Sequence, residues 1–88
     1  MTPAERFEAI RLEITGNDEA IVGAVNRRLS LVAELWELKA ALGYNTVDPD
    51  REQRLREALA AANQGPISAE GLDRLVTELF ALTKRELL

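Results

Sequence analysis

A long N-terminal stretch without any helix-breaking signal is the feature that most constrains this fold. Its start is favourable because Thr2 can cap, Pro3 suits the first helical position and Glu5 completes a capping box. The helical pattern then runs to Leu42, just before Gly43. A helix of that length measures about 60 Å at 1.5 Å per residue. An 88-residue globule cannot cover it alone, so we expect a second copy of the chain to do so.

Two shorter helices are predicted after this stretch. The second has Asp48 as its cap and Pro49 as its first residue, and it fades at Asn63-Gln64-Gly65. Ser68 caps the third helix, whose apolar stripe comprises Leu72, Leu75, Val76, Leu79, Phe80 and Leu82 or Thr83. No β pattern or repeat occurs. We therefore predict one all-α domain over residues 1–88, with three helices, of which the first is very long.

Composition excludes several classes of function. The chain has no cysteine and no histidine, which removes thiolate and imidazole chemistry and the commonest metal ligand, so we expect no metal. A net charge of −4 argues against nucleic-acid binding. The N-terminus lacks the pattern of a signal peptide, and no apolar run is long enough to span a membrane. The expected location is therefore the cytoplasm.

Charged residues interrupt the apolar seam of the first helix. Alternating steps of four and three give Phe7, Arg11, Ile14, Asp18, Ile21, Val25, Arg28, Val32, Leu35, Lys39 and Leu42. A charge on a buried seam costs several kcal/mol unless it is paired or meets a ligand. One such cation would ordinarily be explained by a long stem whose head reaches water, and Asp18 can neutralise another. Three cations on one line favour a site for a small dianion.

Helical geometry divides these cations between sites. Arg28 and Lys39 are eleven residues apart, so they differ by only about 20° in azimuth and about 16 Å in height. Arg11 lies about 25 Å along the helix from Arg28, too far to reach the same small ligand within one subunit. In an antiparallel dimer, Arg11 can enter the site of the partner. We therefore predict two equal sites, each completed in trans.

The chain resembles the all-helical class of chorismate mutases. The resemblance rests on residues 10–14 followed by Asp18, on residues 26–28, on Lys39, and on residues 47–52, and it extends over essentially the whole chain. It implies an intertwined homodimer that converts chorismate into prephenate in phenylalanine and tyrosine biosynthesis. This Claisen rearrangement requires no cofactor, so none is expected. The enzyme would be an isomerase of the intramolecular transferase type.

The resemblance also implies roles for individual residues. Arg11 of one subunit and Arg28 of the other would grip the two carboxylates of the substrate, for which the planar guanidinium is well suited. Lys39 would donate to the ether oxygen as the C–O bond breaks. Taken by themselves, the polar residues that begin the second helix are equally well explained as a solvated helix start. The resemblance implies that Asp48 and Glu52 hold the ring hydroxyl of the substrate and that Arg51 supports the pocket.

One position departs from the pattern of the family. Many members carry Ser near the last turns of the third helix and Gln or Glu four residues later, which also hydrogen-bonds the ether oxygen. Here these positions hold Thr83 and Leu87. Some small members without this Gln are weak alone and are activated by DAHP synthase, the first enzyme of the shikimate pathway. Leu87 and the cationic Lys84-Arg85 end lead us to the same hypothesis for this chain.

Three alternative functions remain open at this point. Isochorismate pyruvate lyase and aminodeoxychorismate mutase share the fold, although the Arg51-Glu52 pair favours the mutase. The chain is also compatible with a non-catalytic helical dimerisation module, in which the cations of the seam pair with acidic groups across the interface. Trp36, beside the seam residue Leu35, has no assigned role.

Overall fold

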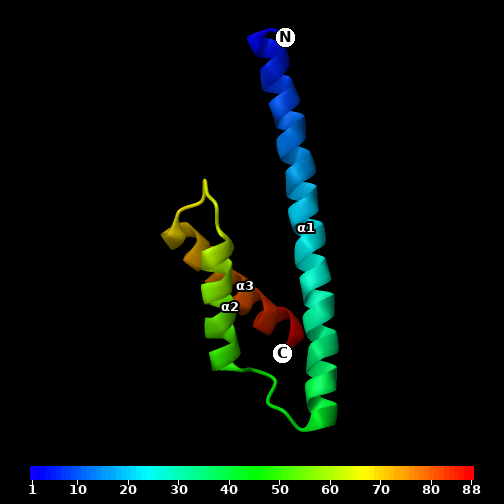
Figure 1. Cartoon of the computed structure of the whole chain (residues 1–88). Helices are drawn as coiled ribbons and strands as arrows, with labels where there is room; N and C mark the ends of the chain where they lie inside the picture. Colours follow the sequence, from blue (N-terminus) through cyan, green and yellow to red (C-terminus); the bar gives the residue numbers. More distant parts are fainter. The chain divides into compact units, whose positions relative to one another are not determined.

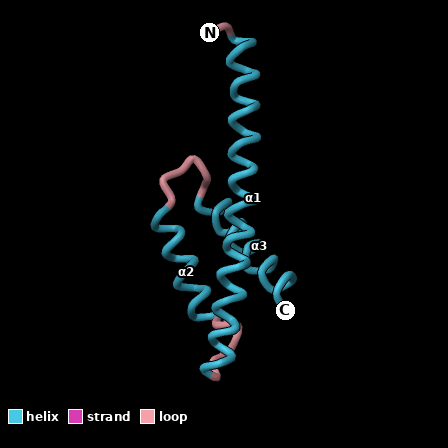
Figure 2. Tube along the Cα trace, turned by 90° about the vertical axis from the view of Figure 1, so that its right-hand side faces the viewer, coloured by secondary structure: helices cyan, strands magenta, loops and turns pink.

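The computed structural model describes residues 1–88 and consists of three helices and their connections (Figures 1 and 2). Helix α1 spans Pro3–Leu42, α2 spans Pro49–Ala62 and α3 spans Ala69–Leu87. The three predicted helices and their boundaries are therefore confirmed. The chain divides into two compact units, Met1–Leu31 and Val32–Leu88, and α1 begins in the first and ends in the second. None of the helices has the length and apolar character needed to cross a membrane.

Helix α1 begins and ends with local hydrogen bonds that its sequence encodes. Thr2 and Glu5 form the predicted capping box, in which each backbone N–H donates to the other's side chain, at 3.1 and 3.2 Å. The bonds from the backbone and the hydroxyl of Thr2 hold the pKa of Glu5 below its ordinary value. At the other end Gly43 adopts a φ of 74°, which an L side chain rarely tolerates. The N–H groups of Gly43 and Tyr44 donate to the carbonyls of Ala40 and Lys39, which is a Schellman motif.

The two shorter helices start at the caps that the sequence predicts. The Asp48 carboxylate accepts a hydrogen bond from the backbone N–H of Arg51 at 3.2 Å, and the Ser68 hydroxyl accepts one from the N–H of Gly71 at 3.0 Å. Each cap satisfies one of the N–H groups that a helix start leaves without a partner. Caps of this kind fix the first turn of α2, which carries several of the predicted site residues.

The small core lies where α3 packs on α2. Its buried residues are Val76, Phe80 and Thr83, all on the predicted stripe of α3. The stripe is narrower than predicted, because Leu75 is half exposed. No residue of α1 or α2 is buried. The second unit therefore has only a thin apolar contact between its helices, and polar contacts carry more of the packing than usual.

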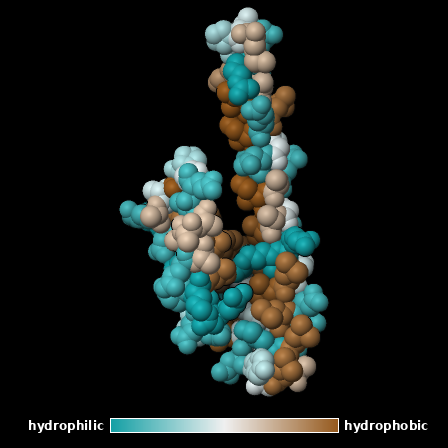
Figure 3. Space-filling model, in the orientation of Figure 1, coloured by the Kyte–Doolittle hydropathy of each residue, from teal (hydrophilic) through white to brown (hydrophobic).

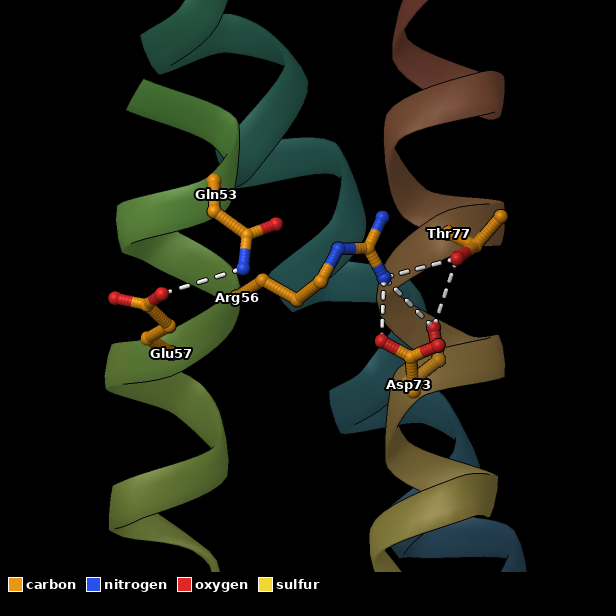
Figure 4. A network of polar contacts seen from close by, with 5 residues as sticks. All are labelled: Gln53, Arg56, Glu57, Asp73 and Thr77. Carbon is orange, nitrogen blue, oxygen red and sulfur yellow. Dashed lines mark hydrogen bonds and ion pairs between the residues drawn. The ribbon is translucent and has the colours of Figure 1, made fainter. Parts of the chain in front are cut away.

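Arg56 joins α2 to α3 through a polar network (Figure 4). Its guanidinium donates to the Asp73 carboxylate at 2.8 Å, to the Asp73 carbonyl at 3.1 Å and to the Thr77 hydroxyl at 2.9 Å. The same group lies 5.2 Å from the centre of the Phe80 ring. The side chain of Arg56 is 27% exposed and that of Asp73 is 60% exposed, so their ion pair is screened somewhat less than one between two fully exposed side chains. Arg56 thus fixes the register of α3 on α2.

Replacing this arginine is expected to weaken the packing of α3. Arg56→Ala removes three hydrogen bonds, one of which is the ion pair with Asp73, and should lower the free energy of unfolding by about 1–2 kcal/mol. Arg74→Ala breaks a 2.9 Å pair with Glu70 whose side chains are both 78% exposed, and should cost less than about 0.5 kcal/mol. Urea denaturation at one fixed protein concentration measures both. Equal losses of unfolding free energy in the two variants would show that Arg56 stabilises the protein no more than a surface cation does.

Candidate active site

A hollow of about 480 Å³ lies in the second unit, where α1 turns into α2. Its size is within the range of pockets that bind small metabolites. Two predicted site residues, Lys39 and Asp48, line this hollow, and its other walls come from the connecting segment and the start of α2, namely Gly43, Tyr44, Asn45, Val47 and Pro49. The structure thus brings a cation and a carboxylate, nine residues apart in sequence, to one cavity.

Lys39 is held at both its backbone and its side chain. Its carbonyl accepts the N–H of Tyr44 at 2.8 Å, and its ammonium donates to the carbonyl of Thr46 at 3.2 Å. The side chain is half-buried. An ammonium has three donors, so the bond to Thr46 leaves two for a ligand. The loop therefore positions the Lys39 ammonium at the hollow without exhausting its donors.

The first turn of α2 places Asp48, Arg51 and Glu52 close together. Asp48 acts as the helix cap, which confirms the local interpretation of this residue. A carboxylate has two oxygens, so this role is compatible with a ligand contact as well. Glu52 is half-buried and pairs with the ammonium of Lys84 on α3 at 3.1 Å, whereas the side chain of Arg51 is exposed.

The predicted pair on α3 has unequal chemistry. Thr83 is buried, and its hydroxyl donates to the carbonyl of Leu79 at 2.7 Å. Leu87 is half-buried and offers no polar group. Position 87, in the last turn of α3, therefore supplies no side-chain hydrogen-bond donor.

The two predicted arginines lie in the first unit, on α1. Arg11 is exposed, with its guanidinium 4.5 Å from the centre of the Phe7 ring and 4.0 Å from the Glu8 carboxylate. Arg28 is half-buried. Arg28 follows Arg11 by seventeen positions, which corresponds to about 25 Å of helix, as expected from the sequence. The same molecule of a small ligand therefore cannot contact both arginines of one chain.

Lys84 is the residue that sequence reasoning missed in this region. It was interpreted only as part of a cationic end of the chain. A signal was present, because Lys84 follows Phe80 by four residues and precedes Leu87 by three, which puts it on the apolar stripe of α3. The criterion that singled out the cations of α1 therefore applies to Lys84 as well.

Comparisons with known proteins identify the family of the chain. Residues 10–86 match the family described as "Chorismate mutase type II". The chain belongs to this family. It is therefore a chorismate mutase, an isomerase, in its family assignment. The resemblance stated from the sequence is confirmed.

Two solved structures of chorismate mutase from Thermus thermophilus are similar to the chain. One, described as form II, has a TM-score of 0.85 and 31% identity, and the match covers 91% of both chains. The other, described as form I, has a TM-score of 0.85 and 32% identity, and the match covers 89% of this chain and 98% of that one. No curated protein matches the chain. The chorismate mutase fold thus extends over almost the whole sequence.

The glycine that ends α1 is expected to matter for this site. Gly43→Ala places a side chain at a φ of 74°, and should cost about 1 kcal/mol in strain although no atom lies within 4 Å of the new Cβ. Gly23→Ala, in the middle of α1 and also free of neighbours, should instead stabilise the protein by up to about 1 kcal/mol. Thermal unfolding of the two variants measures both signs. A neutral Gly43→Ala would show that the helix end tolerates another conformation.

Proposed function

We propose that the chain rearranges chorismate to prephenate at two equal sites of an antiparallel homodimer formed along α1. The observation that carries this proposal is the exposure of the apolar seam. Phe7, Ile14 and Ile21 are each more than half exposed in a single chain, as is Leu42 at 63%. Figure 3 shows brown side chains recurring along α1, densest over its C-terminal half. Apolar area of this extent is typical of an interface.

The dimer also resolves the separation of the arginines. Arg28 of one subunit and the partner subunit's Arg11 would each bind one carboxylate of chorismate, which has two. Guanidinium groups match carboxylates through two parallel hydrogen bonds. Each interface would thus form two identical sites, and neither site would be complete in a monomer.

The remaining residues would act on the reacting atoms and on the ring. Lys39 would donate to the ether oxygen, where negative charge grows as the C–O bond breaks. Asp48 and Glu52 would hold the ring hydroxyl, and Arg51 would support the pocket at the first turn of α2. The reaction transfers no proton and forms no covalent intermediate. The protein therefore contributes restraint of the reactive conformation and electrostatic stabilisation.

The family assignment disfavours the alternatives. A non-catalytic dimerisation module would not account for a match to chorismate mutases over residues 10–86. Isochorismate pyruvate lyase and aminodeoxychorismate mutase act on similar dianions, and side-by-side assays with chorismate, isochorismate and aminodeoxychorismate distinguish the three activities. We expect turnover of chorismate alone.

Mixing two inactive variants tests the shared sites directly. Arg11→Ala and Arg28→Ala should each lose most activity, because each removes a carboxylate partner from every site. After unfolding and refolding together, the mixture should recover about a quarter of wild-type activity, since half of the dimers are mixed and each has one intact site. Recovery requires sites completed in trans. Persistent inactivity of a proven mixed dimer would contradict that assignment.

Leu87 leads to a second proposal, that the isolated enzyme is slow and that DAHP synthase activates it. Loss of one preorganised donor to a developing oxyanion costs roughly 10²–10³ in rate. The docking hypothesis is motivated by the Lys84-Arg85 end of the sequence, of which Arg85 is exposed while Lys84 pairs with Glu52.

Restoring the missing donor tests the first half of this proposal, and adding the synthase tests the second. Leu87→Gln should raise kcat by about tenfold or more, because amide donation to the ether oxygen favours the transition state. Cognate DAHP synthase should raise kcat/KM of the wild type, measured as loss of chorismate absorbance. Unchanged turnover in a demonstrated complex would contradict activation, and unchanged kcat in Leu87→Gln would show that position 87 does not reach the ether oxygen.

A further inference from the structure

The ion pair between Lys84 and Glu52 is, with that between Arg56 and Asp73, one of the two charged contacts that join α3 to α2. Its two atoms are 3.1 Å apart, and its side chains are 38% and 31% exposed. The pairs Arg74–Glu70 and Arg85–Glu78 join residues within α3, and all four of those side chains are mostly exposed. Lys84 instead reaches Glu52 on α2, the residue to which the proposed function gives a contact with the ring hydroxyl of the substrate. The pair therefore links α3 to a residue of the proposed site.

Glu52 presents an electrostatic difficulty that Lys84 removes. Three carboxylates, those of Asp48, Asp50 and Glu52, stand at the start of α2, and the proposed function gives Asp48 and Glu52 contacts with a dianionic substrate. Like charges a few Å apart repel strongly once they are shielded from bulk water. Lys84 brings a positive charge directly against one of them, Glu52. It thereby reduces repulsion of the ligand and leaves Glu52 in one orientation.

We propose that Lys84 is a positioning residue of the active site, which orients the Glu52 carboxylate and offsets its charge so that the site accepts a dianion. This inference rests on the proposed function, in particular on the contact between Glu52 and the ring hydroxyl. Lys84 acts through Glu52 and not on the ether oxygen. Its contribution is therefore made to the bound substrate and to the transition state alike, which affects KM more than kcat.

The geometry of α3 supports this division of roles. Thr83, next to Lys84, is buried against its own helix, and Leu87, three residues on, is apolar. Lys84 is thus the only cation on this face of the last two turns, while Arg85 lies on the exposed side and pairs with Glu78 at 3.9 Å. The stem of Lys84 can cover the apolar stripe while its ammonium stays with Glu52.

Steady-state kinetics of four single variants and one double variant test the proposal. Lys84→Met keeps the length and apolar character of the stem, and should raise KM for chorismate about tenfold while kcat changes less than about threefold. Lys84→Arg retains the charge and should restore most of the affinity. Arg74→Met is the matched control, because it breaks an Arg–Glu pair on the same helix away from the site, and both constants should stay at wild-type values. Circular dichroism confirms that each variant is helical.

The fourth variant, Glu52→Gln, shows whether Lys84 acts through Glu52. In that background, the additional change Lys84→Met should alter KM by less than about twofold, because the carboxylate that Lys84 serves is absent. If the two substitutions changed KM by independent, multiplicative factors, the proposal would be overturned. A KM unchanged in Lys84→Met would also overturn it. A roughly hundredfold lower kcat at constant KM would also overturn it, since it would make Lys84 a donor to the ether oxygen. If the wild type turns over chorismate and Glu52→Gln is impaired, the proposed function stands. A failure of the Lys84 predictions would then contradict this inference alone.

Discussion

Forty of the 88 residues form one helix, yet this helix buries none of its side chains within a single chain. Burial of apolar area is the main favourable term in folding, at about 25 cal/mol per Å². A helix that leaves Phe7, Ile14, Ile21 and Leu42 mostly exposed forgoes that term until something covers its seam. Folding, assembly and activity are therefore expected to depend on one another. The cations on the seam would be tolerated there because they would contact a charged ligand rather than apolar side chains.

Inside the second unit, two ion pairs replace the apolar contact that a larger core would supply. In one pair the cation is on α2, and in the other it is on α3. Arg56 of α2 pairs with Asp73 of α3, and Glu52 of α2 pairs with Lys84 of α3. Sliding or reversing α3 would bring like charges together. Half-buried charges of this kind add little net stability, but they discriminate between alternative packings. The arrangement specifies where α3 lies, and hence where Thr83 and Leu87 stand relative to α2.

The sequence predicts the helices and their ends well, because capping boxes, Pro at N1 and a Gly at C′ are local signals with local causes. Thr2, Asp48, Ser68 and Gly43 all behave in the structure as their residue types require. The family of the chain was also accessible from the sequence, through the spacing of its charged residues. Tertiary contacts were less accessible. Leu75 had the right spacing for the core and is half exposed, since α2 covers only part of the stripe of α3.

The polar partners were the least predictable feature. Neither the reach of Arg56 to Asp73 and Thr77 nor that of Lys84 to Glu52 follows from helical periodicity, because both depend on how one helix crosses another. The roles of Arg11, Arg28 and Lys39 remain predictions, since they concern a ligand and a second subunit. What periodicity does reveal is where a charge interrupts an apolar stripe, and that rule applies equally to α1 and α3.

The two connections of the chain differ in how freely their lengths can change. The segment from Gly43 to Val47 carries the end of α1, accepts the Lys39 ammonium at the Thr46 carbonyl and lines the hollow. An added residue there would displace the anchor of that ammonium. The segment from Asn63 to Ser68 closes on itself, through bonds from the Asn63 amide to the Ile67 carbonyl and from the Gly65 N–H to the Asn63 side chain. A tag, a fluorophore or a new chain terminus therefore belongs at the second connection, where the geometry of the reaction does not depend on loop length.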